Sequence, residues 1–147
     1  MKSKLIHEDS QKTYALIFDV GDEAMEGLRA FAREHGLTAA QFTGIGAFSD
    51  VTLGYFDWVR KDYEAIRLNE QVEVVTLAGD VALKDREPEV HAHVSVGRRD
   101  GSAYGGHLLE GHVRPTLEVI LVESPRYLRK RVDEVSGLAV IDLDDEG

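Results

Sequence analysis

A strict alternation of polar and apolar residues runs through Val90 to Val96, in the order Val-His-Ala-His-Val-Ser-Val. Successive side chains of a β-strand point to opposite faces, so the valines and the alanine share one face. His91, His93 and Ser95 share the other face. The segment is therefore predicted to be a strand of an antiparallel sheet whose apolar face lies in the core.

A turn follows this strand, and its length determines whether a third histidine joins the first two. If Arg99-Asp100-Gly101 is a three-residue loop with its glycine in the left-handed conformation, His93 lies opposite His107 on the same face. A two-residue Asp100-Gly101 turn instead pairs His93 with Leu108 and sends His107 to the other face. The sequence leaves both turns open.

The residue types of this hairpin are those of a metal site. Alternate strand positions are about 6.6 Å apart, so two imidazoles can lean together onto one ion at about 2.0 to 2.1 Å, the usual zinc–nitrogen distance. The chain has no cysteine, which excludes thiolate ligands and thiol catalysis. The predicted ligands of a divalent ion, zinc by ligand type, are His91, His93 and His107. The alternative is that the histidines merely occupy the solvent-facing side of a sheet.

Three nearby features bear on this site. Glu118 interrupts the apolar run Leu117–Val122, and a buried glutamate must be paired, ligated or neutral. It is predicted to be a cross-strand or intersubunit partner, or a fourth ligand, with pairing the favoured role. Gly105-Gly106 indicates that something bulky, such as another chain or a ligand, approaches this backbone closely. His112 falls on the face opposite His107 if the strand is unbroken, and is left out of the site.

The rest of the chain shows one long helical pattern. Met25, Leu28, Phe31 and Ala32 share one face of a helix that is predicted to begin at Gly21-Asp22 and to end near Gly36. The other periodic segments are short, β-rich runs. The predicted strands are 13–20, 40–43, 50–56, 63–68, 71–83, 90–96, 103–109, 117–122 and 138–143, with a short helical turn over 127–132.

These elements predict an α+β fold with a mostly antiparallel sheet of about seven strands, one main N-terminal helix and a short C-terminal helical turn. The 147 residues fit a single domain with frayed ends at 1–12 and 144–147. The run Thr43-Gly44-Ile45-Gly46-Ala47 looks like the start of a dinucleotide loop, but a β-rich run follows it where a helix is expected. A tight backbone bend is the better interpretation.

Charge and hydropathy limit the partners. No apolar run approaches the roughly 20 residues that cross a bilayer, and the N-terminus lacks a signal-peptide core, so no membrane partner and a cytoplasmic location are expected. The formal charge of −10 repels phosphate backbones and disfavours DNA binding. The densest candidate for a local basic patch contains Arg126, Arg129, Lys130 and Arg131.

Several spaced motifs together resemble the PPC domain, the plants and prokaryotes conserved domain, whose bacterial and archaeal members are often stand-alone proteins. The resemblance runs from about Tyr14 to Leu143. The motifs that carry it are Gly44-Ile45-Gly46-Ala47, Gly79-Asp80, His91-Ala92-His93-Val94-Ser95, Gly105-Gly106-His107-Leu108, and Gly111 followed by Leu117-Glu118-Val119.

The resemblance implies an antiparallel sheet flanked by helices, assembly as a homotrimer, and metal ligation by His91, His93 and His107. Plant members carry a separate AT-hook that binds the minor groove, but this sequence has no Arg-Gly-Arg-Pro core.

Two functions remain open. One is a homotrimeric protein with a three-histidine metal site and an unassigned reaction. The other is an assembly module with DNA or transcription-factor partners, in which the histidines are incidental.

Overall fold

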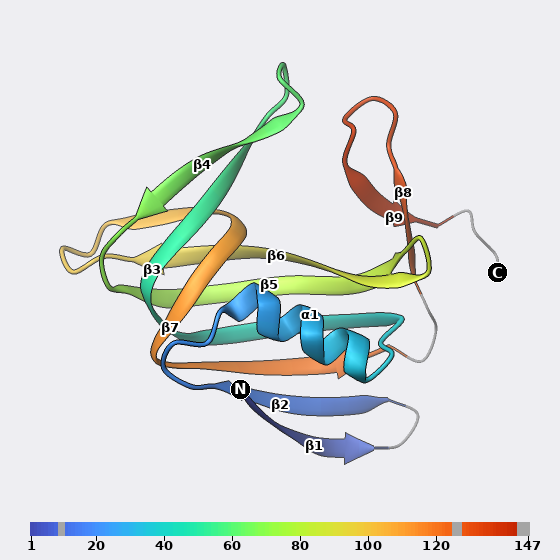
Figure 1. The fold of residues 1–147 in the computed structure, drawn as a ribbon, viewed down its shortest axis with the longest axis horizontal. Coiled ribbons are helices and arrows are strands. Elements are labelled where there is room, and N and C mark those ends of the chain that lie inside the picture. Colours follow the sequence, from blue (N-terminus) through green and yellow to red (C-terminus); the bar gives the residue numbers. More distant parts are fainter. Residues whose placement is uncertain (9–10, 125–127, 144–147) are drawn as a thin grey trace.

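A computed structural model describes residues 1–8, 11–124 and 128–143, and within them one helix lies against a large sheet (Figure 1). The elements are β1 (Lys2–Glu8), β2 (Lys12–Phe18), α1 (Ala24–Glu34), β3 (Ala39–Asp57), β4 (Asp62–Leu68), β5 (Val72–Lys84), β6 (Glu87–Gly97), β7 (Ala103–Glu123), β8 (Arg129–Val132) and β9 (Ala139–Asp142). The described part of the chain is therefore largely β with a single helix, which is less helical than an α+β fold.

Nine strands of the described residues form one sheet in the order β1-β2-β7-β3-β5-β8-β9, with β4 beside β3. Strand β6 pairs with both β5 and β7, so β3, β5, β6 and β7 close a ring of pairings. The sheet is mixed, because β5 and β8 are parallel where Leu83 pairs with Arg129, while the other pairs are antiparallel. This ring brings the histidine strand β6 beside β5 and β7.

Two strands are much longer than the sequence predicts. The predicted strands 40–43 and 50–56 are parts of β3, and 103–109 and 117–122 are parts of β7. The pairing of β3 with β5 shifts register between Gly44 and Gly46, and its pairing with β7 shifts between Gly46 and Phe48. Such irregularities bend a strand without ending it. The Gly44–Ala47 segment is thus a bend inside a strand, in agreement with the interpretation from the sequence.

Both ends of the described chain differ from the prediction. Lys2–Glu8 is strand β1, paired with β2, and is not frayed. The predicted helical turn over 127–132 is wrong, because Arg129–Val132 is strand β8, paired with β9. Lys130 is buried there while Arg129 and Arg131 are exposed, which is the period of two of a strand. Residue 127 and residues 144–147 lie outside the described residues.

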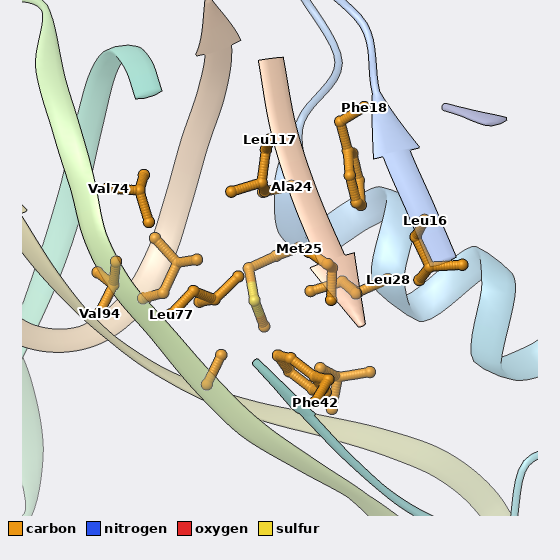
Figure 2. Close-up of a cluster of buried hydrophobic side chains, with 14 of the residues drawn as sticks. Leu16, Phe18, Ala24, Met25, Leu28, Phe42, Val74, Leu77, Val94 and Leu117 are labelled. Atoms are coloured by element: carbon orange, nitrogen blue, oxygen red, sulfur yellow. The ribbon is translucent and has the colours of Figure 1, made fainter. Parts of the chain in front are cut away.

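Helix α1 packs its predicted apolar face on the sheet. Met25, Leu28, Phe31 and Ala32 are all buried, and Figure 2 shows Met25 and Leu28 among side chains of the sheet such as Leu77. The hydrophobic effect on this face fixes the helix against β6 and β7. No helix in the described ranges is both long enough and apolar enough to cross a bilayer.

The helix begins at Ala24, after the predicted start, because Glu23 caps it. One carboxylate oxygen of Glu23 accepts from the amides of Met25 at 3.1 Å and of Gly111 in β7 at 2.9 Å. The other accepts from the amide of Glu26 at 2.6 Å. One side chain thus satisfies free amides at the helix start and joins the helix to β7.

Glu23→Ala is expected to lower the free energy of unfolding by about 1 to 2 kcal/mol, because it leaves helical and strand amides without their acceptor. Urea unfolding followed by circular dichroism measures the change. The control is Glu34→Ala, at the exposed far end of α1, which should stay within about 0.5 kcal/mol of the wild type. Equal losses in the two variants would contradict the capping role.

Candidate metal centre

The turn between β6 and β7 is the three-residue loop that the metal site requires. The amide of Arg98 donates to the carbonyl of Ser102 at 2.8 Å, which leaves Arg99-Asp100-Gly101 as the loop. Gly101 has φ of 83°, in the left-handed region that glycine adopts without strain. His93 pairs directly with His107. The turn is therefore the one that places His107 on the same face as His91 and His93.

Three imidazoles converge at this hairpin. His91 and His93 come from β6 and His107 from β7, and each offers a nitrogen that lies within 4.8 Å of the other two. The ring centroids are 5.0 Å apart for His91 and His93, 5.0 Å for His91 and His107, and 5.5 Å for His93 and His107. Nitrogens around a tetrahedral zinc ion are about 3.3 Å apart, so small side-chain rotations would close the cluster onto an ion.

The chemistry of the cluster fits a cation. Nδ1 of His107 is buried and has no hydrogen-bond partner among the described residues. Burial, followed by the nearby positive charges, lowers the pKa of His107 to about 4. Burial also lowers the pKa of His93, with His91 adding to the effect. Both rings are therefore held neutral near pH 7, which is the form that ligates metals.

A carboxylate behind the cluster orients one of the rings. Nδ1 of His91 lies 3.5 Å from Oδ2 of Asp80, which sits opposite it on β5. This contact leaves Nε2 of His91 for a ligand, the arrangement of a carboxylate–histidine–metal triad. Burial opposes ionisation of Asp80, but His91 and Lys130 outweigh it and lower the pKa of the carboxyl.

Lys130 completes this arrangement from β8. Its Nζ lies 2.9 Å from Oδ1 of Asp80, at the distance of an ion pair but without hydrogen-bond geometry, and the side chain is only 2% exposed. Sequence reasoning missed both Asp80 and the role of Lys130. Gly79-Asp80 is a motif of the resemblance, but only the register of β5 against β6 shows which histidine Asp80 contacts.

The surroundings of Glu118 and of the paired glycines differ from the expectation: Glu118 is exposed, and the close neighbour of Gly106 belongs to the same chain. Glu118 is exposed and does not belong to the three-histidine group. It sits between Ile17 of β2 and Ile45 of β3, its direct neighbours in the register. A Cβ on Gly106 would lie 2.8 Å from the carbonyl oxygen of Gly54, so the bulky neighbour is strand β3. The fourth-ligand role of Glu118 has no support within one chain.

The basic run does not form one face. Arg126 lies outside the described residues. Arg131 pairs with Asp142 at 3.3 Å, and Lys130 faces inward toward Asp80 while Arg129 is exposed. The cations of the described part of this run thus point to both sides of a strand and are partly neutralised.

His112 is placed outside the cluster, as the sequence predicts, and its ring is held by a carboxylate. Nδ1 of His112 is 2.7 Å from Oδ1 of Asp50 on β3. This hydrogen bond raises the pKa of His112 and lowers the pKa of Asp50. Both side chains are more than a third exposed, 39% and 42%, so their coupling is expected to stay below about 1 kcal/mol.

The coupling between Asp50 and His112 is expected to weaken as the pH rises. The raised pKa of His112 makes its contribution complete below pH 6.5 and lost as the pH passes above the folded-state pKa. The lowered pKa of Asp50 removes its contribution only in acid, as the pH falls below 3.8. A double-mutant cycle with His112→Ala and Asp50→Ala should give a larger coupling energy at pH 5.5 than at pH 8.5. An equal or larger coupling at pH 8.5 would contradict the ion pair.

Several proteins of known structure have the same fold as this chain. A plant- and prokaryote-conserved (PPC) protein of Pyrococcus horikoshii is 34% identical, with a TM-score of 0.83 over 96% of this chain and 94% of that one. A protein of Archaeoglobus fulgidus described as metal-containing is 32% identical, with a TM-score of 0.82 over 96% and 99%. A putative DNA-binding protein of Bacteroides thetaiotaomicron is 26% identical, with a TM-score of 0.86 over 95% and 96%.

Curated sequences match over a part of their own length. Bifunctional GlmU proteins of two Synechococcus strains are 30% and 31% identical over 132 residues, which is 87% of this chain but 20% of theirs. The family profile of the Plants and Prokaryotes Conserved (PCC) domain, also written PPC, matches residues 6–125. That match covers most of the chain, including all three histidines and the ring of strands that carries them. The chain therefore belongs to the plants and prokaryotes conserved domain family.

Proposed function

We propose that this protein binds a divalent ion, zinc by ligand type, through His91, His93 and His107. The observation that carries the proposal is the convergence of three imidazole nitrogens within 4.8 Å. The description of the Archaeoglobus relative as a metal-containing protein supports this proposal. Three protein ligands leave one position of a tetrahedral ion open, where the ion would polarise a water molecule or a small anion.

The surrounding residues have positioning roles in this proposal. Asp80 holds Nδ1 of His91 and so fixes which nitrogen points into the cluster. Lys130 holds Asp80 in its ionised form from the buried side. Tyr63 packs its ring 4.7 Å from the ring of His107 and limits its rotation. Pre-organised ligands lose less conformational entropy when an ion binds.

Elemental analysis tests the proposal. The chain is purified without a nickel column, dialysed at pH 7.5, and analysed for zinc, manganese, iron, cobalt, nickel and copper. One equivalent of a divalent metal per chain is expected, together with a rise in melting temperature when zinc is added back to chelator-treated protein. Less than about 0.1 equivalent of every metal, and no thermal shift with any of them, would refute a resident ion.

We further propose that the protein assembles as a homotrimer through an exposed apolar face. Ile17, Ile45, Val75 and Ile120 are 37%, 62%, 59% and 45% exposed and come from the neighbouring strands β2, β3, β5 and β7. Isolated chains seldom expose such a patch. Glu118 lies in the middle of it, where a cation of another copy would pair with it. This supports the intersubunit role of Glu118.

Light scattering after size exclusion tests the assembly. The wild type is expected at the mass of three 16.3 kDa chains. Ile45→Glu places a second carboxylate beside Glu118 and should shift the mass toward one chain. The control is Val59→Glu, at a position that is 89% exposed in the β3–β4 turn, which should keep the wild-type mass. A monomeric wild type would refute the trimer.

A second candidate function is an assembly module that contacts DNA, which the description of the Bacteroides relative favours. The net charge of −10 and the ion pairs of Lys130 and Arg131 weigh against it. Fluorescence anisotropy with a labelled duplex at 20 mM salt separates the two. No binding by the trimer is expected, and submicromolar affinity that falls with added salt would favour the DNA function.

A further inference from the structure

A hollow of about 470 Å³ lies directly beside the three-histidine cluster. His91 and His107 form part of its wall, and Tyr63 of β4 and Arg29 of α1 form another part. Gly137 and Leu138, in the turn before β9, also line it. The volume is that of a site for a metabolite-sized molecule, since small-molecule sites measure about 300 to 1,000 Å³.

More cations than carboxylates line this hollow, in a strongly acidic chain. Three cationic side chains line it, Arg29, Lys84 and Lys130, against one carboxylate, Glu89. Glu89 is 3.3 Å from Lys84 and neutralises it. Arg29 makes no ion pair within the described residues. A site that concentrates positive charge in a chain of net charge −10 selects anions locally against the average field.

Lys130 adds a buried donor to this wall. Its side chain is 2% exposed, and its Nζ contacts Oδ1 of Asp80 at 2.9 Å. Asp80, which forms this ion pair, also contacts His91. A buried ammonium group carries three donors, so Nζ has donors left for the oxygens of a bound molecule.

We propose that this hollow binds a small organic or inorganic oxyanion, a carboxylate or a phosphate, between Arg29, Lys130 and the metal cluster. Arg29 presents a guanidinium fork that matches either group in a bidentate manner. His91 and His107 line this hollow, so an ion held by them would lie at its wall and would offer a contact to a second oxygen of the ligand. The inference rests on the proposed metal site for that last contact, whereas the cationic contacts belong to the chain itself.

Calorimetric titration with succinate and with inorganic phosphate, at constant ionic strength, tests the proposal on the purified protein with and without added zinc. At least one of the two anions is expected to bind, and the stronger one identifies the class. Arg29→Gln should weaken binding about tenfold or more without changing metal content. The matched control is Arg33→Gln, one turn further along the exposed side of α1 and outside the hollow, which should bind like the wild type.

The metal site and the oxyanion site can be refuted independently of each other. Metal-loaded protein that binds neither anion, or an Arg29→Gln variant that binds them like the wild type, would overturn the oxyanion site and leave the metal site standing. Arg29-dependent binding of an anion, in protein that takes up none of the tested metals when they are added, would support the oxyanion site while refuting the ion.

Discussion

His107→Ala is expected to lower the affinity for the divalent ion by more than about 100-fold. Substitutions of residues that only support a metal ligand already cost about 10 to 100-fold, and this one removes a proposed ligand. The ring sits opposite His93, and its pKa of about 4 keeps it neutral and able to ligate near pH 7. Competition with a chromogenic chelator measures the affinity, and elemental analysis after dialysis measures the retained metal.

The matched control is His112→Ala, which removes an imidazole from the same strand. The ring of His112 is bound to Asp50 and lies outside the cluster, so this variant should retain the wild-type amount of metal. If His107→Ala retains one equivalent, or if both variants lose metal equally, His107 is not a ligand. His93→Ala gives an independent check from strand β6.

The histidine cluster could be predicted from local pattern because its three members lie in one hairpin. The period of two places His91 and His93 on one face, and the glycine of the Arg99-Asp100-Gly101 loop allows the turn that adds His107. Both inferences need only the chain between the first and third histidine. The uncertainty concerned the length of the turn, and one hydrogen bond of Arg98 with Ser102 resolves it.

The supporting residues could not be predicted in the same way, because they come from distant segments. Asp80 reaches His91 through the register of β5 on β6. Lys130 reaches Asp80 from β8, a segment in which several cations in succession favour an interpretation as a solvated helix. Its burial depends on an acidic partner 50 residues away in the sequence. Local charge patterns contain no information about such partners.

The full length of strands β3 and β7 could not be predicted from the sequence either. Glycines and polar residues inside these strands resemble the breaks between strands, so each long strand is read as two short ones. The structure shows that the breaks are shifts of register at which a strand bends and continues. Gly46 lies at one of these bends, where the pairing register of β3 shifts against both β5 and β7.

Gly46→Ala is expected to lower the free energy of unfolding by about 3 to 5 kcal/mol. Gly46 has φ of 157°, in a region that residues with a Cβ rarely adopt. A Cβ there would press against the carbonyl oxygen of Thr116 and lie 2.7 Å from Cα of Leu117, both backbone atoms of β7 that cannot rotate away. Overpacking costs about 1 to 3 kcal/mol, and a sparsely populated backbone conformation costs about 1 to 3 kcal/mol. Urea unfolding measures the loss, with soluble yield recorded if the variant does not fold.

Gly36→Ala separates the two causes of this loss. Gly36 also has a positive φ, of 58°, but a Cβ there would meet no atom within 4 Å. It should therefore lose only the backbone contribution of about 1 to 2 kcal/mol and show the metal affinity of the wild type. A Gly46→Ala variant no less stable than Gly36→Ala would show that β3 and β7 can separate at the bend. Because β7 carries His107 and pairs with β3 along most of its length, such a separation would also change metal affinity, so both quantities are measured on the same samples.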